Sequence, residues 1–217
     1  SLMNRLVVKH TGNWAIVPHM SDGMSFKKCI TYDTERGAYI WDNLTNTVDL
    51  LYEDCVGAWV HELPTFRGNR LAAFEHQTGF NMTVRRCLGV GVLGGPGAGA
   101  FVWPEIGLNF PTPWKFEDCT GLACKGWGAF TWQNNSKDHR VPTSGRFTII
   151  NCGLGGIEHG AYSNSYDYSN TTIYNSAAES VGLRLHALSK TAFNGERFQR
   201  FTVRGGKHAI DIPHHNL

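Results

Sequence analysis

A short motif recurs five times along the chain and ends each time in a cysteine. Each copy consists of a large apolar residue, two intervening residues and the cysteine, and the cysteines are Cys29, Cys55, Cys87, Cys119 and Cys152. They are separated by 26, 32, 32 and 33 residues. A repeat of roughly 20–50 residues is typical of solenoids, in which each repeat buries its apolar side against its neighbours. The spacing therefore predicts stacked coils with the five cysteines in one inward column.

The charges in front of the cysteines alternate in sign from one motif to the next. The first charged positions are Lys27, Glu53, Arg85 and Glu117, and the second are Lys28, Asp54, Arg86 and Asp118. In parallel, in-register strands about 4.8 Å apart, each of these residues lies beside its equivalent in the next coil. Opposite charges attract at that distance and like charges repel. The alternation therefore favours a parallel sheet with the motifs in register and the charges facing outward.

A second segment in each coil has a small residue, an alanine and an aromatic residue, as in Gly99-Ala100-Phe101 and Gly128-Ala129-Phe130. Period-two alternation places the aromatic residues inside, and we expect Phe101 and Phe130 to stack. The expected inward column is Trp14, Tyr39, Phe74, Phe101, Phe130 and Tyr162. The same alternation predicts an outward column of Ala38, Ala73, Ala100, Ala129 and Ala161. The next outward positions include Ile40, Glu75, Val102, Arg184 and Asp211.

These patterns predict an all-β fold, a single right-handed parallel β-helix solenoid of about eight coils. The right hand follows because crossover connections between parallel strands are overwhelmingly right-handed. A chain of 217 residues fits one domain over residues 1–217. Neither end has a recognisable cap, although solenoids need capped ends. We therefore expect an excised part of a longer protein, with flanking domains or further copies of the chain as partners.

Composition excludes several classes of protein. The net charge is +2 and no basic cluster with interleaved aromatic residues occurs, so nucleic acid is not an expected partner. No apolar run is long enough to span a membrane. The absence of Cys-x-x-Cys argues against zinc, and the glycine-rich segment 89–99 lacks the Gly-Lys-Ser/Thr of a phosphate-binding loop, so no metal or cofactor is expected. The cysteines either form disulfides between coils or are buried thiols, and an odd number in one column favours thiols.

The inward cysteine ladder followed by the Gly-Ala-aromatic strand resembles the pectin-lyase-like superfamily of right-handed β-helices. The resemblance covers nearly the whole chain and implies an extracellular or cell-surface protein that binds or processes polysaccharides. Other members are tailspikes, adhesins and surface stalks. The paired acidic motif of polygalacturonase-like members is missing, since Asp-Asp does not occur, and only Glu158-His159-Gly160 is similar to their histidine motif. Whether the chain is a hydrolase, a lyase or no enzyme stays open.

Candidate binding residues are sought where the coils carry long insertions, because function concentrates in irregular loops on a regular scaffold. The insertions after Cys55, Trp103 and Trp132 supply the ligand-binding candidates Glu62, Arg67, Arg70, Glu105 and His139, with Trp59 and Phe66 as stacking surfaces. A second group is Glu158, His159, Arg184 and Asp211. Glu158 and His159 are strand neighbours and should face opposite sides. Arg184 and Asp211 lie in successive coils and form either a salt bridge or a joint site.

Three functions follow from these observations. The first is an extracellular module that binds or processes a polysaccharide. The second is a non-catalytic stalk or a tailspike-like or adhesin-like segment that forms homo-oligomers. The third is a scaffold whose active residues lie outside this chain. An acidic cluster in a loop-walled groove would favour the first function, and a flat apolar outward face would favour the second.

Overall fold

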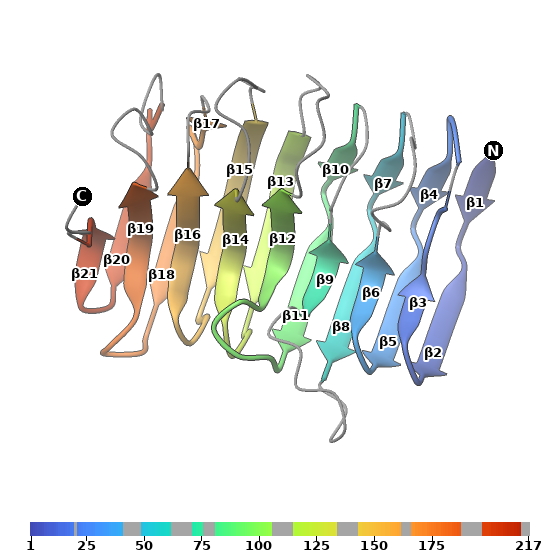
Figure 1. The fold of residues 1–217 in the computed structure, drawn as a ribbon, viewed down its shortest axis with the longest axis horizontal. Coiled ribbons are helices and arrows are strands. Elements are labelled where there is room, and N and C mark those ends of the chain that lie inside the picture. Colours follow the sequence, from blue (N-terminus) through green and yellow to red (C-terminus); the bar gives the residue numbers. More distant parts are fainter. Residues whose placement is uncertain are drawn as a thin grey trace.

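The computed structural model is an all-β solenoid of parallel strands stacked along one long axis (Figure 1). The structure describes residues 1–19, 21–40, 49–61, 71–75, 81–105, 115–133, 143–161, 166–187 and 197–213. Within these ranges no helix is long and apolar enough to cross a membrane. The parallel strands confirm the predicted fold class, an all-β solenoid.

The strands form two sheets that enclose the core. The eight-stranded sheet contains β3 (Trp14–Ile16), β6 (Gly37–Ile40), β9 (Ala72–Glu75), β12 (Gly99–Glu105), β14 (Trp127–Gln133), β16 (Gly155–Ala161), β19 (Val181–Ala187) and β21 (His208–Asp211). The thirteen-stranded sheet is folded into two rows. Its first row contains β1 (Leu2–Asn4), β4 (Ser25–Lys27), β7 (Leu51–Glu53), β10 (Thr83–Arg85) and β17 (Tyr166–Asp167). Its second row contains β2 (Val7–Thr11), β5 (Ile30–Thr34), β8 (Val56–Val60), β11 (Leu88–Val92), β18 (Thr172–Asn175) and β20 (Thr202–Gly205). The longer strands β13 (Lys115–Leu122) and β15 (Thr143–Ile150) run through both rows.

The turns of the solenoid are not all built alike. Four successive turns consist of three separate strands each, namely β1–β3, β4–β6, β7–β9 and β10–β12. In the following turns, β13 and β15 replace two short strands by one continuous strand. The expectation of about eight coils therefore overstates the number of turns that repeat in one form.

The corners between strands are made by residues in the left-handed backbone conformation. At the corner between the first and second rows, the residues before the cysteines have φ from 49° to 55°, and they are Lys28, Asp54, Arg86 and Asp118. At the corner that ends the second row, φ lies between 51° and 65° for His10, Asp33, Trp59, Gly91, Ala123 and Asn151. L-residues adopt this conformation only at a cost, usually as single residues. Each corner therefore fixes the backbone at one equivalent position in successive coils, and we call the second set the corner column.

The predicted charge ladder is confirmed. Lys27 lies opposite Glu53, Glu53 opposite Arg85, and Arg85 opposite Glu117. Lys27 Nζ lies 2.9 Å from Glu53 Oε2, and Arg85 Nε lies 3.0 Å from Glu117 Oε2. Hydrogen bonds from Lys27 and then from Arg86 lower the pKa of the Glu53 carboxyl group. The second ladder, which ends in the sequence motif at Asp118, continues by one residue in the structure. Arg146 Nη2 donates a hydrogen bond to Asp118 Oδ2 at 2.9 Å.

Reversal of the central charge should weaken the solenoid. In Glu53→Lys, the new ammonium group would face Lys27, Arg85 and Arg86, so we expect the free energy of unfolding to fall by about 1–2 kcal/mol. Denaturant unfolding at low and high salt measures this loss, which should shrink as salt screens the repulsion. The double reversal Glu53→Lys with Arg85→Glu should recover part of the stability. An equal stability of wild type and Glu53→Lys at low salt would contradict the ladder.

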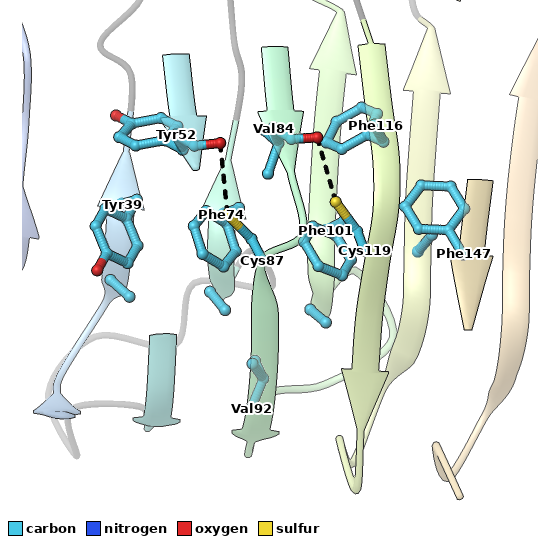
Figure 2. Close-up of a cluster of buried hydrophobic side chains, with 14 of the residues drawn as sticks. Tyr39, Tyr52, Phe74, Val84, Cys87, Val92, Phe101, Phe116, Cys119 and Phe147 are labelled. Carbon is cyan, nitrogen blue, oxygen red and sulfur yellow. Dashed lines mark hydrogen bonds between the residues drawn. The ribbon is translucent and has the colours of Figure 1, made fainter. Parts of the chain in front are cut away.

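Four of the five cysteines form the predicted inward column. Cys29, Cys55, Cys87 and Cys119 are fully buried, and residues on both sides of them are in register. Cys87 Sγ donates to the Tyr52 carbonyl at 3.5 Å and Cys119 Sγ to the Val84 carbonyl at 3.3 Å (Figure 2). All six cysteines of the chain are free thiols, as the thiol alternative predicts. Burial raises the pKa of Cys119 to about 12, so this thiol stays protonated and unreactive.

The prediction for Cys152 is wrong. Between β13 and β15 the register shifts, because Phe116 lies opposite Gly145 while Cys119 lies opposite Phe147. The chain thus returns to the cysteine column at Phe147, 28 residues after Cys119, whereas Cys152 follows Cys119 by 33 residues and lies five residues past the column. Cys152 consequently lies beside Cys124, whose carbonyl accepts a hydrogen bond from the Gly153 amide at 2.8 Å.

The aromatic column is correct for Phe101 and wrong for Phe130. The rings of Tyr39 and Phe74 stack at 4.7 Å, and those of Phe74 and Phe101 at 5.4 Å (Figure 2). Phe101 lies opposite Ala129, however, and Phe130 lies opposite Val102 in a separate apolar cluster. A Cβ atom on Gly128 would approach Ile149 Cγ2 to 2.3 Å, so no alanine fits there and the motif is displaced by one residue.

Trp14 does not stack on Tyr39 as predicted. Ile16, rather than Trp14, lies opposite Tyr39. Tyr162 is outside the described residues.

The alanine column faces the core rather than solvent. Ala38, Ala73, Ala100 and Ala129 are fully buried, and the side chain of Ala161 is outside the described part of the chain. A Cβ atom built on Gly57 would lie 2.9 Å from the Cβ atoms of Ala38 and Ala73. Consecutive residues Ala73 and Phe74 both belong to the main core, so strict alternation fails in this sheet. The two sheets therefore approach each other closely along this glycine–alanine contact.

Candidate functional site

Of the loop candidates, only Trp59 has its side chain within the described residues. Glu62, Phe66, Arg67, Arg70 and His139 lie outside the described residues, as does the side chain of Glu105 at the end of β12. Trp59, near the end of β8, is described and half-exposed, with 50% of its surface accessible.

Trp59 occupies the corner column between Asp33 and Gly91. Its backbone φ is 53°, and its ring lies against the next coil, where a Cβ atom on Gly91 would be 3.4 Å from the ring. Because Gly91 has no side chain, the large ring can lie close to the backbone of the solenoid. The indole is therefore held at a fixed position while half of its surface stays exposed.

Asp33 links two imidazole rings beside this tryptophan. His10 Nδ1 lies 2.5 Å from Asp33 Oδ2, and His61 Nε2 lies 2.7 Å from Asp33 Oδ1. The three residues come from successive coils, since Val60 lies opposite Thr34 and Thr34 opposite Thr11. Hydrogen bonds from His61 and then from His10 lower the pKa of the Asp33 carboxyl group. The carboxylate is thus ionised and fixed in orientation from both sides.

Tyr32 adds a second exposed aromatic ring. It points outward from β5 with 44% of its surface accessible, and its ring meets that of His10 edge to face at 6.5 Å. We call His10, Tyr32, Asp33, Trp59 and His61 the corner cluster. It combines two aromatic surfaces with one carboxylate and two imidazoles, which can pack against the C–H face of a sugar and bond its hydroxyl groups.

Sequence reasoning found only Trp59 of this cluster. The signal for the remainder was the position four residues after each cysteine, which holds Asp33 in one coil and Trp59 in the next. That position looks unremarkable in the sequence because its residue types differ from coil to coil. Only the shared left-handed backbone reveals that they form one column.

The second group of candidates is divided between two faces. Glu158 lies opposite Arg184, and Arg184 Nε forms the expected salt bridge with Asp211 Oδ2 at 2.9 Å. The Arg184 guanidinium also lies over the Trp127 ring, 5.3 Å from its centroid. His159 faces the core, where its Nδ1 is 2.9 Å from the Tyr168 hydroxyl. Three of the four residues therefore meet on the outer side of β16, β19 and β21.

Among the described residues, no group of three histidine, cysteine, aspartate or glutamate side chains is arranged to hold a metal ion. Comparison of the chain with protein-family models, with curated proteins and with solved structures gives no match.

Proposed function

We propose that this solenoid binds a polysaccharide through the corner cluster, outside the cell or at its surface, as the resemblance to pectin-lyase-like proteins implies. The observation that carries the proposal is the pair of exposed rings, Tyr32 and Trp59, beside a carboxylate held by two imidazoles. Exposed tyrosine and tryptophan are typical of binding surfaces, because each ring offers a large apolar area with little conformational freedom to lose. Their position on strands of a rigid scaffold supports recognition without rearrangement.

The proposal is binding rather than cleavage. Glycoside hydrolysis by the common mechanisms uses two carboxyl groups about 5–10 Å apart, one of which must be protonated to act as the acid. The corner cluster contains a single carboxyl group, and its lowered pKa makes it an acceptor of hydrogen bonds. Asp33 is therefore assigned to orienting sugar hydroxyl groups.

Loss of either ring should weaken binding strongly. We expect Trp59→Ala and Tyr32→Ala each to reduce affinity about tenfold or more, the loss typical of a central aromatic contact. A glycan array identifies a ligand of the wild type, and calorimetry then compares the variants. Leu154→Ala removes another exposed apolar side chain and should leave affinity unchanged. Unchanged affinity in a folded Trp59→Ala variant would refute the proposal.

A non-catalytic stalk that associates with copies of itself is the second candidate function. It is favoured by the apolar outward face of the second row, where Val7, Ile30 and Tyr32 are exposed. A solution mass that corresponds to an oligomer would support this function.

A further inference from the structure

The outward face of the second row is built from two straight columns of side chains. The first column is Val7, Ile30, Val56, Leu88, Thr120, Thr148, Thr172 and Thr202. The second column is Lys9, Tyr32, Ala58, Val90, Leu122, Ile150, Tyr174 and Arg204. All of these residues are exposed or half-buried, whereas the residues between them in each strand are mainly buried. We call the two columns the flat face, which follows the long axis of the solenoid (Figure 1).

The flat face carries charge only at its ends. Lys9 and Arg204 are the first and last members of the second column, and every residue between them is apolar, threonine or tyrosine. Tyr32 lies near one end and Tyr174, 38% exposed with the Arg204 guanidinium over its ring, lies near the other. An acidic polymer would need cations distributed along its path, so this surface suits an uncharged partner.

The flat face is continuous with the corner cluster. Each corner-column residue directly follows a member of the second column, as Asp33 follows Tyr32 and Trp59 follows Ala58. Beyond Trp59 the corner column continues with Gly91, Ala123 and Asn151, which are small or medium-sized and uncharged. A ligand held at the corner cluster can therefore extend over the flat face without meeting an obstacle from this column.

We infer that the ligand is a neutral polysaccharide whose chain lies along the solenoid axis, from the corner cluster across the flat face to Tyr174; this inference rests on the proposed function. Five strand spacings separate the strand of Tyr32 from that of Tyr174, which makes a path of about 24 Å, enough for several sugar units. The methyl-bearing side chains match the C–H faces of the sugars. The hydroxyl groups of Thr120, Thr148 and Thr172 are available to bond sugar hydroxyls along one edge.

A second copy of the chain fits this face less well. If two flat faces pack in opposite directions, Lys9 of one copy approaches Arg204 of the other, and if they pack in the same direction, each cation meets its own equivalent. Like charges across an interface oppose association. A neutral glycan has no such charges.

The test uses short and long fragments of neutral glycans on variants of the whole chain. The probes are disaccharides and fragments long enough to span the flat face, prepared from cellulose, laminarin, mannan and chitin, with galacturonan and hyaluronan fragments as acidic counterparts. We expect wild-type affinity for the best neutral glycan to rise about tenfold or more with fragment length. Leu122→Glu and Tyr174→Ala should abolish that gain and leave disaccharide affinity unchanged, while Trp59→Ala weakens both. Leu122→Met is the matched control, and thermal melting confirms that each variant is folded.

Each other outcome overturns the inference in a distinguishable way. If the disaccharide binds and depends on Trp59 but affinity does not rise with length, the extended path is wrong and the proposed function stands. Tighter binding of acidic than of neutral fragments overturns the assignment of ligand class. If no fragment of any glycan binds, both the inference and the proposed function fail. A dimer that Leu122→Glu converts to a monomer would show that a second copy covers the flat face.

Discussion

Replacement of Phe101 by alanine should lower the free energy of unfolding by about 3–5 kcal/mol, through lost burial and the cavity left behind. The ring is fully buried, and its centroid lies 5.4 Å from that of Phe74, 6.0 Å from Phe116 and 5.5 Å from Phe147. It therefore joins the aromatic residues of both sheets in the middle of the solenoid. Chemical denaturation followed by far-ultraviolet circular dichroism measures the loss.

Two control variants test whether this cost comes from the core. Phe101→Leu keeps most of the apolar volume and should cost clearly less. Tyr32→Ala removes an aromatic ring from the exposed flat face and should change stability by no more than about 0.5 kcal/mol. If Phe101→Ala costs no more than Tyr32→Ala, the assignment of the inward face is wrong.

Gly89→Val should lower the free energy of unfolding by about 3 kcal/mol, because the two sheets leave no room for a side chain there. A Cβ atom would lie 2.7 Å from Ala100 Cβ, 3.0 Å from Ala73 Cβ and 3.1 Å from Ala100 Cα. The last contact is with backbone, so the sheets would have to separate. The same unfolding experiment should show a smaller loss for Gly89→Ala.

A compensating change makes this second prediction specific. In Gly89→Ala with Ala100→Gly, the methyl group moves from one sheet to the other, and much of the lost stability should return. Gly12→Ala is the control, since only the end of the flexible Glu35 side chain lies near its Cβ, at 3.3 Å. Failure of Ala100→Gly to improve Gly89→Ala would mean that the two residues do not face each other.

The sequence correctly predicted the charge ladder and most of the cysteine column, because both depend on a repeat of constant form. Alternating charges at Lys27, Glu53 and Arg85 require neighbouring coils in register, and the structure has these residues opposite one another. Cys29, Cys55, Cys87 and Cys119 follow the same rule because their coils have equivalent corners. Repetition in the sequence therefore translates directly into stacking where every coil has the same build.

The failures arise where a motif is kept but the coil around it changes. Cys152 and Phe130 both belong to copies of their motifs. A coil that returns to the cysteine column five residues early displaces the first, and the bulk of Ile149 near Gly128 displaces the second. The alanine column failed because consecutive residues face the core where the sheets nearly touch. Packing across the interior decides these positions, and a periodic pattern within one strand contains no information about it. Most of the corner cluster could not be predicted from the sequence for a similar reason. Its residues share a backbone conformation and differ in residue type.

The left-handed corners separate recognition from stability in this solenoid. Six residue types as different as histidine, aspartate, tryptophan, glycine, alanine and asparagine occupy the same corner position in successive coils. The backbone there is set by hydrogen bonds to the neighbouring coils, such as Ala123 N to Ile150 O at 2.9 Å, and does not depend on which side chain is carried. A lineage of such chains could therefore exchange these residues one coil at a time and acquire a new ligand without rebuilding its core. The corner column is the part of this molecule best suited to change during evolution and to redesign in the laboratory.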